Sequence, residues 1–222
     1  MKNLVRSMIA LISLSGALGL SLNAGAQDVK AGDAKAGEKK AQMCIGCHGI
    51  PDYKASFPEV FRVPMIAGQN AKYIVSALTQ YKKGDRKHPT MRSVATSLSD
   101  QDMTDLAAFY STQAKAQNLP ATATVPANVA ALLAKGSCAS CHGANFSAPI
   151  DPSYPKLAGQ HGDYLYVALR AYQIEKNPLI GRNNAIMAGM AKPYTLAETK
   201  ILANYFASLP GEMKTVPQSR FR

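Results

Sequence analysis

The sequence of 222 residues contains no tryptophan, only four cysteines and only 18% charged side chains. Four cysteines are too few for the disulfide framework that stabilises many small secreted proteins. Low charge beside 47% hydrophobic residues excludes an intrinsically disordered chain. Acidic residues are also scarce, since 14 Asp and Glu accompany 25 Lys and Arg and leave a formal net charge of +11. This excess favours an acidic partner, whether nucleic acid, lipid or protein.

Long apolar runs are missing beyond the N-terminus, so no later segment is predicted to cross a membrane. At the N-terminus, Lys2 and Arg6 precede an uncharged run of 16 residues, and Ala24-Gly25-Ala26 offers a peptidase site. A bilayer span needs about 20 residues, so we predict a signal peptide over 1–26, with a retained anchor as the alternative. The mature chain, Gln27–Arg222, carries +9. Export to a compartment such as the periplasm makes nucleic acid an unexpected partner.

The four cysteines lie in two identical C-x-x-C-H-G motifs, at 44–49 and 138–143. C-x-x-C-H is the attachment site of c-type haem. Two thiols on one helical turn can add to the two vinyl groups of a porphyrin, and the following histidine can then reach the iron. The residues of this prediction are Cys44, Cys47 and His48 in the first motif and Cys138, Cys141 and His142 in the second.

Two other readings of these cysteines are less well supported. A thioredoxin-like redox pair needs a βαβ setting and gives the histidines no role. A shared zinc ion is disfavoured because the motifs are 94 residues apart, far beyond the usual spacing. We therefore predict two covalently bound haem c groups, which use every cysteine and leave none for a disulfide.

The duplication extends well beyond the motifs. Residues 64–69 match 155–160 at an offset of 91, whereas 106–110 match 202–206 at an offset of 96. The second copy therefore carries five extra residues after Tyr172. We predict an N-terminal domain over 27–113, a linker rich in Ala, Thr and Pro over 114–127, and a C-terminal domain over 128–222.

Apolar residues recur at helical spacing and no alternating strand pattern of useful length appears, so both domains are predicted to be all-α. The predicted helices cover Ala34–Met43 after an Asp33 N-cap, 71–83 before Gly84, 129–135, 163–173, and the segments after Ser99-x-x-Asp102 and Thr195-x-x-Glu198. The tyrosines of two of these helices, Tyr73, Tyr81, Tyr164 and Tyr172, are predicted to pack in the core. A haem in each domain would supply much of the apolar surface that about 90 residues lack.

The tandem order of helix, C-x-x-C-H-G motif, methionine loop and terminal helix resembles the diheme class I cytochromes c, and above all the cytochrome c4 family. The resemblance covers Gln27 to Leu209 and includes both Pro-x-Ile/Leu-Ala-Gly-Gln segments and a Gly-x-Arg-like turn before each methionine. It implies two tandem class I cytochrome c domains, each wrapped around one covalent haem.

In that family each iron takes the motif histidine and a later methionine as its ligands. The resemblance therefore implies His48 with Met91 and His142 with Met187. Met91 and Met187 keep the offset of 96, whereas Met190, the alternative, aligns with Val94.

The resemblance also implies that the carbonyls of Pro64 and Pro155 accept hydrogen bonds from the ligating imidazoles. His88 and His161 align with no histidine of the other copy and are predicted to lie in surface loops. His88 is a minor alternative as a ligand.

An iron with histidine and methionine ligands has no vacant position for a substrate and can only transfer electrons. The protein is therefore not predicted to be an enzyme. We expect a periplasmic diheme electron-transfer protein. The resemblance implies delivery from a quinol-oxidising complex or a dehydrogenase to a terminal oxidase. A dehydrogenase subunit and a diheme enzyme with one open iron remain alternatives.

The predicted partners are redox proteins with acidic docking surfaces, and peripheral membrane association is possible in this interpretation. A basic cluster ahead of Met91 is predicted to dock them. It consists of Lys82, Lys83, Arg86 and Lys87 around Asp85.

Overall fold

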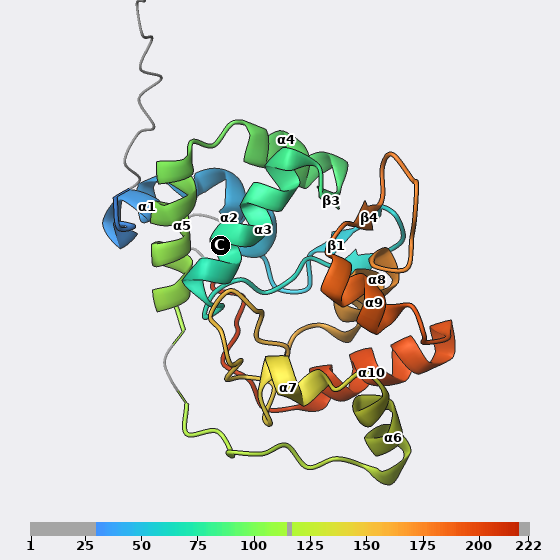
Figure 1. The fold of residues 1–222 in the computed structure, drawn as a ribbon. Helices are drawn as coiled ribbons and strands as arrows, with labels where there is room; N and C mark the ends of the chain where they lie inside the picture. The colour runs from blue at the N-terminus through green and yellow to red at the C-terminus, as the bar shows by residue number, and fades with distance from the viewer. Residues whose placement is uncertain (1–29, 115–116, 218–222) are drawn as a thin grey trace, which may run out of the picture.

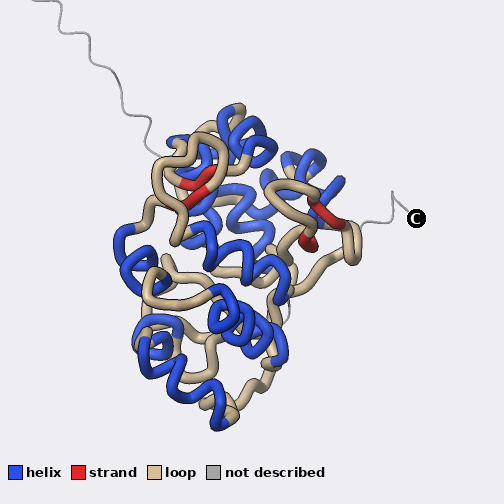
Figure 2. Tube along the Cα trace, turned by 90° about the vertical axis from the view of Figure 1, so that its right-hand side faces the viewer, coloured by secondary structure: helices blue, strands red, loops and turns tan. Residues whose placement is uncertain are grey.

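The computed structural model describes residues 30–114 and 117–217, so the predicted signal peptide lies outside the described residues. Helices make up most of the regular structure, and the strands are short (Figure 2). No helix in the described parts of the chain is long and apolar enough to span a bilayer.

The described part of the first domain, from residue 30 to 114, contains five helices and three two-residue strands. They are α1 (Ala34–Lys40), α2 (Gln42–His48), β1 (Lys54–Ala55), β2 (Phe61–Arg62), α3 (Ala71–Lys83), β3 (Arg86–Lys87), α4 (Pro89–Thr96) and α5 (Asp100–Thr112). The first and last helices pack together, and α3 lies against α4 and α5 (Figure 1). The core between them includes Ile45, Ile74, Leu106 and Phe109.

The second domain repeats this order with one strand. Its elements are α6 (Ala127–Lys135), α7 (Cys138–His142), α8 (Gly162–Ala171), β4 (Gly181–Arg182), α9 (Ala185–Ala191) and α10 (Leu196–Ser208). Helix α10 packs against α6 and α8, over a core that includes Val129, Phe146, Leu165 and Phe206. The described part of the linker runs as a loop along the outside of the molecule to α6 (Figure 1).

Local signals for helix ends are confirmed where a side chain caps the backbone. The Asp33 carboxylate accepts hydrogen bonds from two amides of α1. Ser99 and Thr195 each form a complete capping box, and Gly84 ends α3 with a φ of 85°. These side chains satisfy amides that a helix leaves unpaired at its first turn.

Two features of the helices differ from the prediction. The first predicted helix is divided at Ala41, because α1 ends at Lys40 and a separate helix carries the first motif. Both methionine loops contain a short helix, α4 or α9. His88 and Asn184 cap these helices, which have only eight and seven residues and are too short for their apolar spacing to predict a helix.

Strands β3 and β4 join the two domains as an antiparallel pair, with Arg86 opposite Arg182 and Lys87 opposite Gly181. The amide of Asn183 donates a further 2.7 Å hydrogen bond to the carbonyl of Asp85. Because Arg86 and Arg182 are equivalent in the duplication, the pairing places two copies of one position side by side.

Two buried glutamines connect the domains in the same reciprocal way. Gln69 donates to the carbonyl of Lys156 at 3.1 Å and accepts from its amide at 2.9 Å. Gln160 donates to the carbonyl of Met65 at 2.8 Å and accepts from its amide at 3.0 Å. Both side-chain amides also approach the Met213 sulfur. Each domain thus binds the other through the same segment.

The chain after α10 returns to the first domain. The amide of Lys214 donates to the carbonyl of Ala67 at 3.0 Å, and Val216 packs against the first core. Ion pairs between Arg62 and Asp163 and between Arg170 and Glu59 add to the contact between domains.

Candidate haem sites

Helices α2 and α7 place the two cysteines of each motif within one helical turn. All four thiols are free and partly exposed, so no disulfide competes for them in the described residues. Helix α7 ends at Gly143, whose φ is +79° and whose Cβ would lie 2.0 Å from the Ala148 carbonyl oxygen. Only glycine fits there, and its turn brings the following chain close to the motif.

Each motif histidine is oriented by a proline carbonyl, at the contact that the resemblance implies. His48 Nδ1 lies 2.8 Å from the Pro64 oxygen, and His142 Nδ1 lies 3.0 Å from the Pro155 oxygen. With Nδ1 as the donor, Nε2 carries no proton, and its lone pair is free to bind a metal. Burial lowers the pKa of both histidines, which keeps the imidazoles neutral as metal ligands must be.

Met91 and Met187 occupy the same position in their domains. Each is the third residue of its short helix and is partly buried. Their amides donate to the capping side chains of His88, at 3.4 Å, and Asn184, at 2.9 Å. Met190 is 42% exposed on the outer side of α9.

His88 lies in the connection between β3 and α4, as predicted, but it is more than an exposed loop residue. Besides capping α4, its ring meets the rings of Phe57 and Phe61 edge-on and is partly buried. Burial lowers the pKa of His88, so it acts as a neutral acceptor. His161 precedes α8 and is also partly buried.

A buried arginine, Arg86, and its partly buried counterpart, Arg182, lie at the centre of the interface. The guanidinium of Arg86 donates to the Tyr164 hydroxyl at 2.6 Å and to the Tyr73 hydroxyl at 3.2 Å. The guanidinium of Arg182 donates to the same Tyr164 hydroxyl at 3.3 Å. Beyond these bonds, the guanidiniums lie over the rings of Tyr81 and Tyr172. The tyrosine stripes therefore form a polar cluster between the domains instead of simple core packing.

The cluster contains two positive charges and no carboxylate from the described chain. Burial opposes ionisation of the Tyr164 hydroxyl, but the two guanidiniums outweigh it and lower its pKa to about 8. Burial raises the pKa of its counterpart Tyr73 to about 12. Neither arginine forms an ion pair with any described carboxylate, and Arg86 Nε has no hydrogen-bond partner there.

Buried cations without an anion are costly, so this cluster fits a negatively charged group that the protein chain does not supply. A haem carries two propionate carboxylates and meets this need. Together with the paired thiols and neutral imidazoles, the unpaired Arg86 Nε shows that the residues present fit haem.

The basic cluster predicted ahead of Met91 is only partly solvated: Lys83 is exposed, but other members are engaged, and the docking role stays a prediction. Arg86 is only 6% exposed, in the interface. Lys87 donates to the Asn177 carbonyl of the second domain, and Lys82 donates to the carbonyl of Leu98. Local sequence does not indicate that these cations are engaged, because their acceptors are distant in the chain.

The alternative readings of the cysteines find no support in the fold. Strands in the described chain have two residues each and build no βαβ unit. Within 30–114 and 117–217, no three His, Cys, Asp or Glu side chains gather as a metal site.

Sequence reasoning missed the reciprocal glutamines and the arginine pair as interface residues. The signal was their duplication, since Gln69 matches Gln160 and Arg86 matches Arg182. Buried polar residues that repeat in both copies indicate a contact in which both copies use the same surface.

Comparison with known proteins identifies the same two units. The cytochrome c family model matches residues 34–113 and 126–210. Cytochrome c4 of Azotobacter vinelandii is 30% identical over 90% of this chain and 98% of its own length. The crystal structure of reduced recombinant cytochrome c4 from Pseudomonas stutzeri has a TM-score of 0.59 at 28% identity, and the match covers 81% of this chain and all of that one.

A relative with a more specific description is the thiosulfate dehydrogenase electron acceptor of Stutzerimonas stutzeri. It is 30% identical over 90% of this chain and 94% of its own length. The predicted resemblance and the predicted fold, two tandem helical cytochrome c domains, are both confirmed.

Proposed function

Because this chain belongs to the cytochrome c family and, within it, to the diheme cytochromes c4, we propose that it carries electrons in the periplasm from a quinol-oxidising complex or dehydrogenase to a terminal oxidase. It is a diheme electron-transfer protein whose cofactors are two covalently bound haem c groups. Each bound haem supplies a one-electron couple at its iron.

The chain's own residues hold and orient these groups. Cys44 and Cys47 attach the first haem, and Cys138 and Cys141 attach the second, as paired thioethers. His48 and His142 offer Nε2 to the irons, because the carbonyls of Pro64 and Pro155 bind Nδ1. The proline contacts prevent ring rotation and increase the basicity of the ligating nitrogen.

Met91 and Met187 would be the second ligands that hold the irons. The observation that supports this proposal best is the equivalence of the two sites: the same imidazole–carbonyl bond and a methionine at the third position of the same short helix. With a histidine and a methionine to hold each iron, neither haem would offer a place for substrate, and the protein would act as a carrier and not as an enzyme.

The experiment that tests the ligands measures carbon monoxide binding and the near-infrared sulfur-to-iron band in matched variants. Met91→Ala and Met187→Ala should each open one iron, halve the band and allow rapid carbon monoxide binding at one haem. Met190→Ala is the control and should leave both readouts unchanged. Rapid binding to the unmodified protein would favour an enzyme with one open iron.

The number of haems and the processing site are tested by mass spectrometry. Denatured protein from the periplasm should carry two haems on a chain that begins at Gln27. A chain with one haem, or one that retains residues 1–26, would contradict the attachment or the export proposal.

A dedicated dehydrogenase subunit is the second candidate, favoured by the similarity to the thiosulfate dehydrogenase electron acceptor. In either role the net charge of +9 on the mature chain favours partners with acidic docking surfaces. Size-exclusion chromatography of a native periplasmic extract separates the roles. A haem peak at the mass of one chain supports a free carrier, whereas co-elution with a dehydrogenase supports a subunit.

A further inference from the structure

The Tyr110 side chain in the first domain carries a buried hydroxyl that the electron-transfer role does not use. Tyr110 lies on α5 and is 7% exposed, and its hydroxyl has no hydrogen-bond partner in the described chain. Its ring packs edge-on against Phe109 at 5.0 Å, and its carbonyl accepts from the Gly68 amide at 2.9 Å. The residue is thus fixed in place with a free hydroxyl proton.

Cys44 packs against the cluster of buried residues to which Tyr110 belongs. Burial raises the pKa of the Tyr110 hydroxyl, and the neighbouring Cys44 raises it further. A hydroxyl held in its protonated form is a donor, and a buried donor without an acceptor is costly.

Haem attachment changes what Cys44 can do. As a thiol it can donate its own proton, but as a thioether it can only accept. The Tyr110 hydroxyl then becomes the donor of this pair.

The second domain provides the natural comparison. At the position equivalent to Tyr110 it has Phe206, which has no hydroxyl, although its carbonyl likewise accepts from a glycine amide, that of Gly159. A tyrosine from elsewhere, Tyr194, lies beside Cys138. Its hydroxyl donates a 2.6 Å hydrogen bond to the Leu132 carbonyl, so its single proton is already engaged.

We propose that the Tyr110 hydroxyl donates a hydrogen bond to the Cys44 thioether sulfur and thereby raises the reduction potential of the first haem relative to the second. Reduction adds one electron to the haem and leaves the proton on Tyr110 in both states. In such a bond the proton end of the O–H dipole would face the attached sulfur in a buried site, and it would stabilise the form of the haem with the additional electron. This inference rests on the haem attachment proposed above.

The test is a potentiometric titration of haem-loaded Tyr110→Phe, with each step assigned through haem methyl resonances near Met91 or Met187. Loss of the donor should shift the reduction equilibrium of the first haem about three- to fivefold towards the oxidised form. At 59 mV per tenfold change this is about 30 to 40 mV. The second haem should not move.

The matched control is Tyr194→Phe, which removes a hydroxyl beside the other attached cysteine. Because that proton is bound to the Leu132 carbonyl, the second potential should change by less than half as much. An unchanged first potential in Tyr110→Phe, or equal shifts at both haems, would overturn the proposal.

A direct measurement uses the unmodified protein. In the reduced state, the Tyr110 hydroxyl proton should exchange slowly and show an NMR contact to the Cys44 β-protons; absence of this contact would overturn the hydrogen bond. Haem stoichiometry measured on the same samples distinguishes a failure of haem attachment from a failure of the proposed hydrogen bond. A missing first haem would overturn the attachment as well, whereas two haems with an unchanged potential overturn only the role of Tyr110.

Discussion

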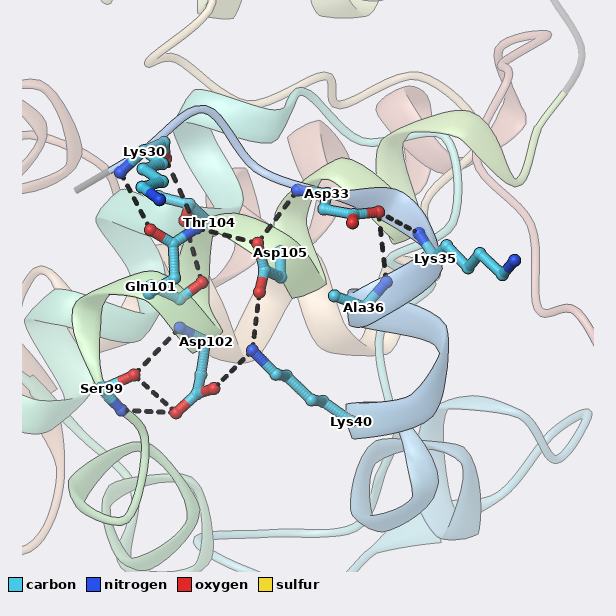
Figure 3. A network of polar contacts seen from close by, with 10 residues as sticks. All are labelled: Lys30, Asp33, Lys35, Ala36, Lys40, Ser99, Gln101, Asp102, Thr104 and Asp105. Carbon is cyan, nitrogen blue, oxygen red and sulfur yellow. Dashed lines mark hydrogen bonds and ion pairs between the residues drawn. The ribbon is translucent and has the colours of Figure 1, made fainter.

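The two domains hold their first and last helices together by different means. In the first, Lys40 Nζ contacts the carboxylates of Asp102 at 2.7 Å and Asp105 at 2.6 Å (Figure 3). Asp105 is 3% exposed and also accepts from the amide of Asp33 and the side chain of Gln101. This crossing is built around a buried charge that is fully hydrogen-bonded.

In the second domain the same crossing is mainly apolar. Val129 and Leu133 of α6 pack against the core, and the position equivalent to Asp105 is Ile201, which is 39% exposed. The ion pair between Lys135 and Glu198 is partly exposed and longer, at 3.3 Å. The same helix crossing is thus stabilised by a buried ionic network in one domain and by apolar packing in the other. The ionic network should tolerate fewer substitutions, because each of its polar groups needs its partner.

The largest loss of stability is expected at Gly37, where the backbones of α1 and α5 lie in close contact. A Cβ there would lie 2.0 Å from the Asp105 carbonyl oxygen and 2.8 Å from the Phe109 Cβ. Gly37→Ala should therefore destabilise the first domain by about 3 kcal/mol or more, since backbone must move. Guanidinium unfolding of the haem-loaded protein measures this. Ala131→Ser, at an exposed position of α6, should cost less than about 0.5 kcal/mol.

Removal of the buried carboxylate should have the next largest effect. Asp105→Ala leaves Lys40 and the Asp33 amide without this acceptor, so we expect a loss of about 2 to 3 kcal/mol. Hydrogen exchange of α1 and α5 peptides should rise, while peptides of α6 and α10 stay unchanged. Ile201→Ala is the matched control, and an equal loss there would contradict the contrast between the domains.

Acid should open the first domain before the second. Hydrogen bonds from Lys40 and then Ser99 lower the pKa of Asp102 to about 2, below the ordinary 3.8. Because the folded pKa is the lower one, this stabilisation is complete above about pH 4 and disappears as the pH falls towards 2. Hydrogen exchange at pH 5, 3 and 2 measures the loss of protection in α1 and α5. Earlier loss in α6 and α10 would argue against the network.

The smallest effect is expected at Lys135. Its pair with Glu198 is partly exposed, and its ammonium lies 4.7 Å from the centre of the Tyr194 ring. Lys135→Ala should cost no more than about 1 kcal/mol. Lys40→Ala, unfolded in parallel, should lower the free energy of unfolding more than Lys135→Ala does.

Features encoded in a few neighbouring residues could be predicted from the sequence. The C-x-x-C-H-G motifs, the Asp33 cap and the Ser99 capping box involve residues no more than five apart, and their chemistry acts locally. The all-α fold and its duplication followed from patterns of this kind.

Contacts between distant residues could not be predicted in the same way. Nothing near Arg86 indicates that it is buried opposite Arg182, because the pairing depends on how two complete domains meet. The helix break at Ala41 also depends on tertiary packing, since Ala41 is fully buried against the core. Local propensity does not report such constraints.

The reciprocal contacts of Gln69 and Gln160 have an evolutionary consequence. An interface in which each half binds the same segment of the other is the arrangement of an isologous homodimer. Here both halves belong to one polypeptide, as expected if an ancestral dimer of single-haem proteins became covalently joined by gene fusion. Once fused, the halves were free to diverge, so that Tyr110 and Phe206 could differ while the ancestral contact surface was retained.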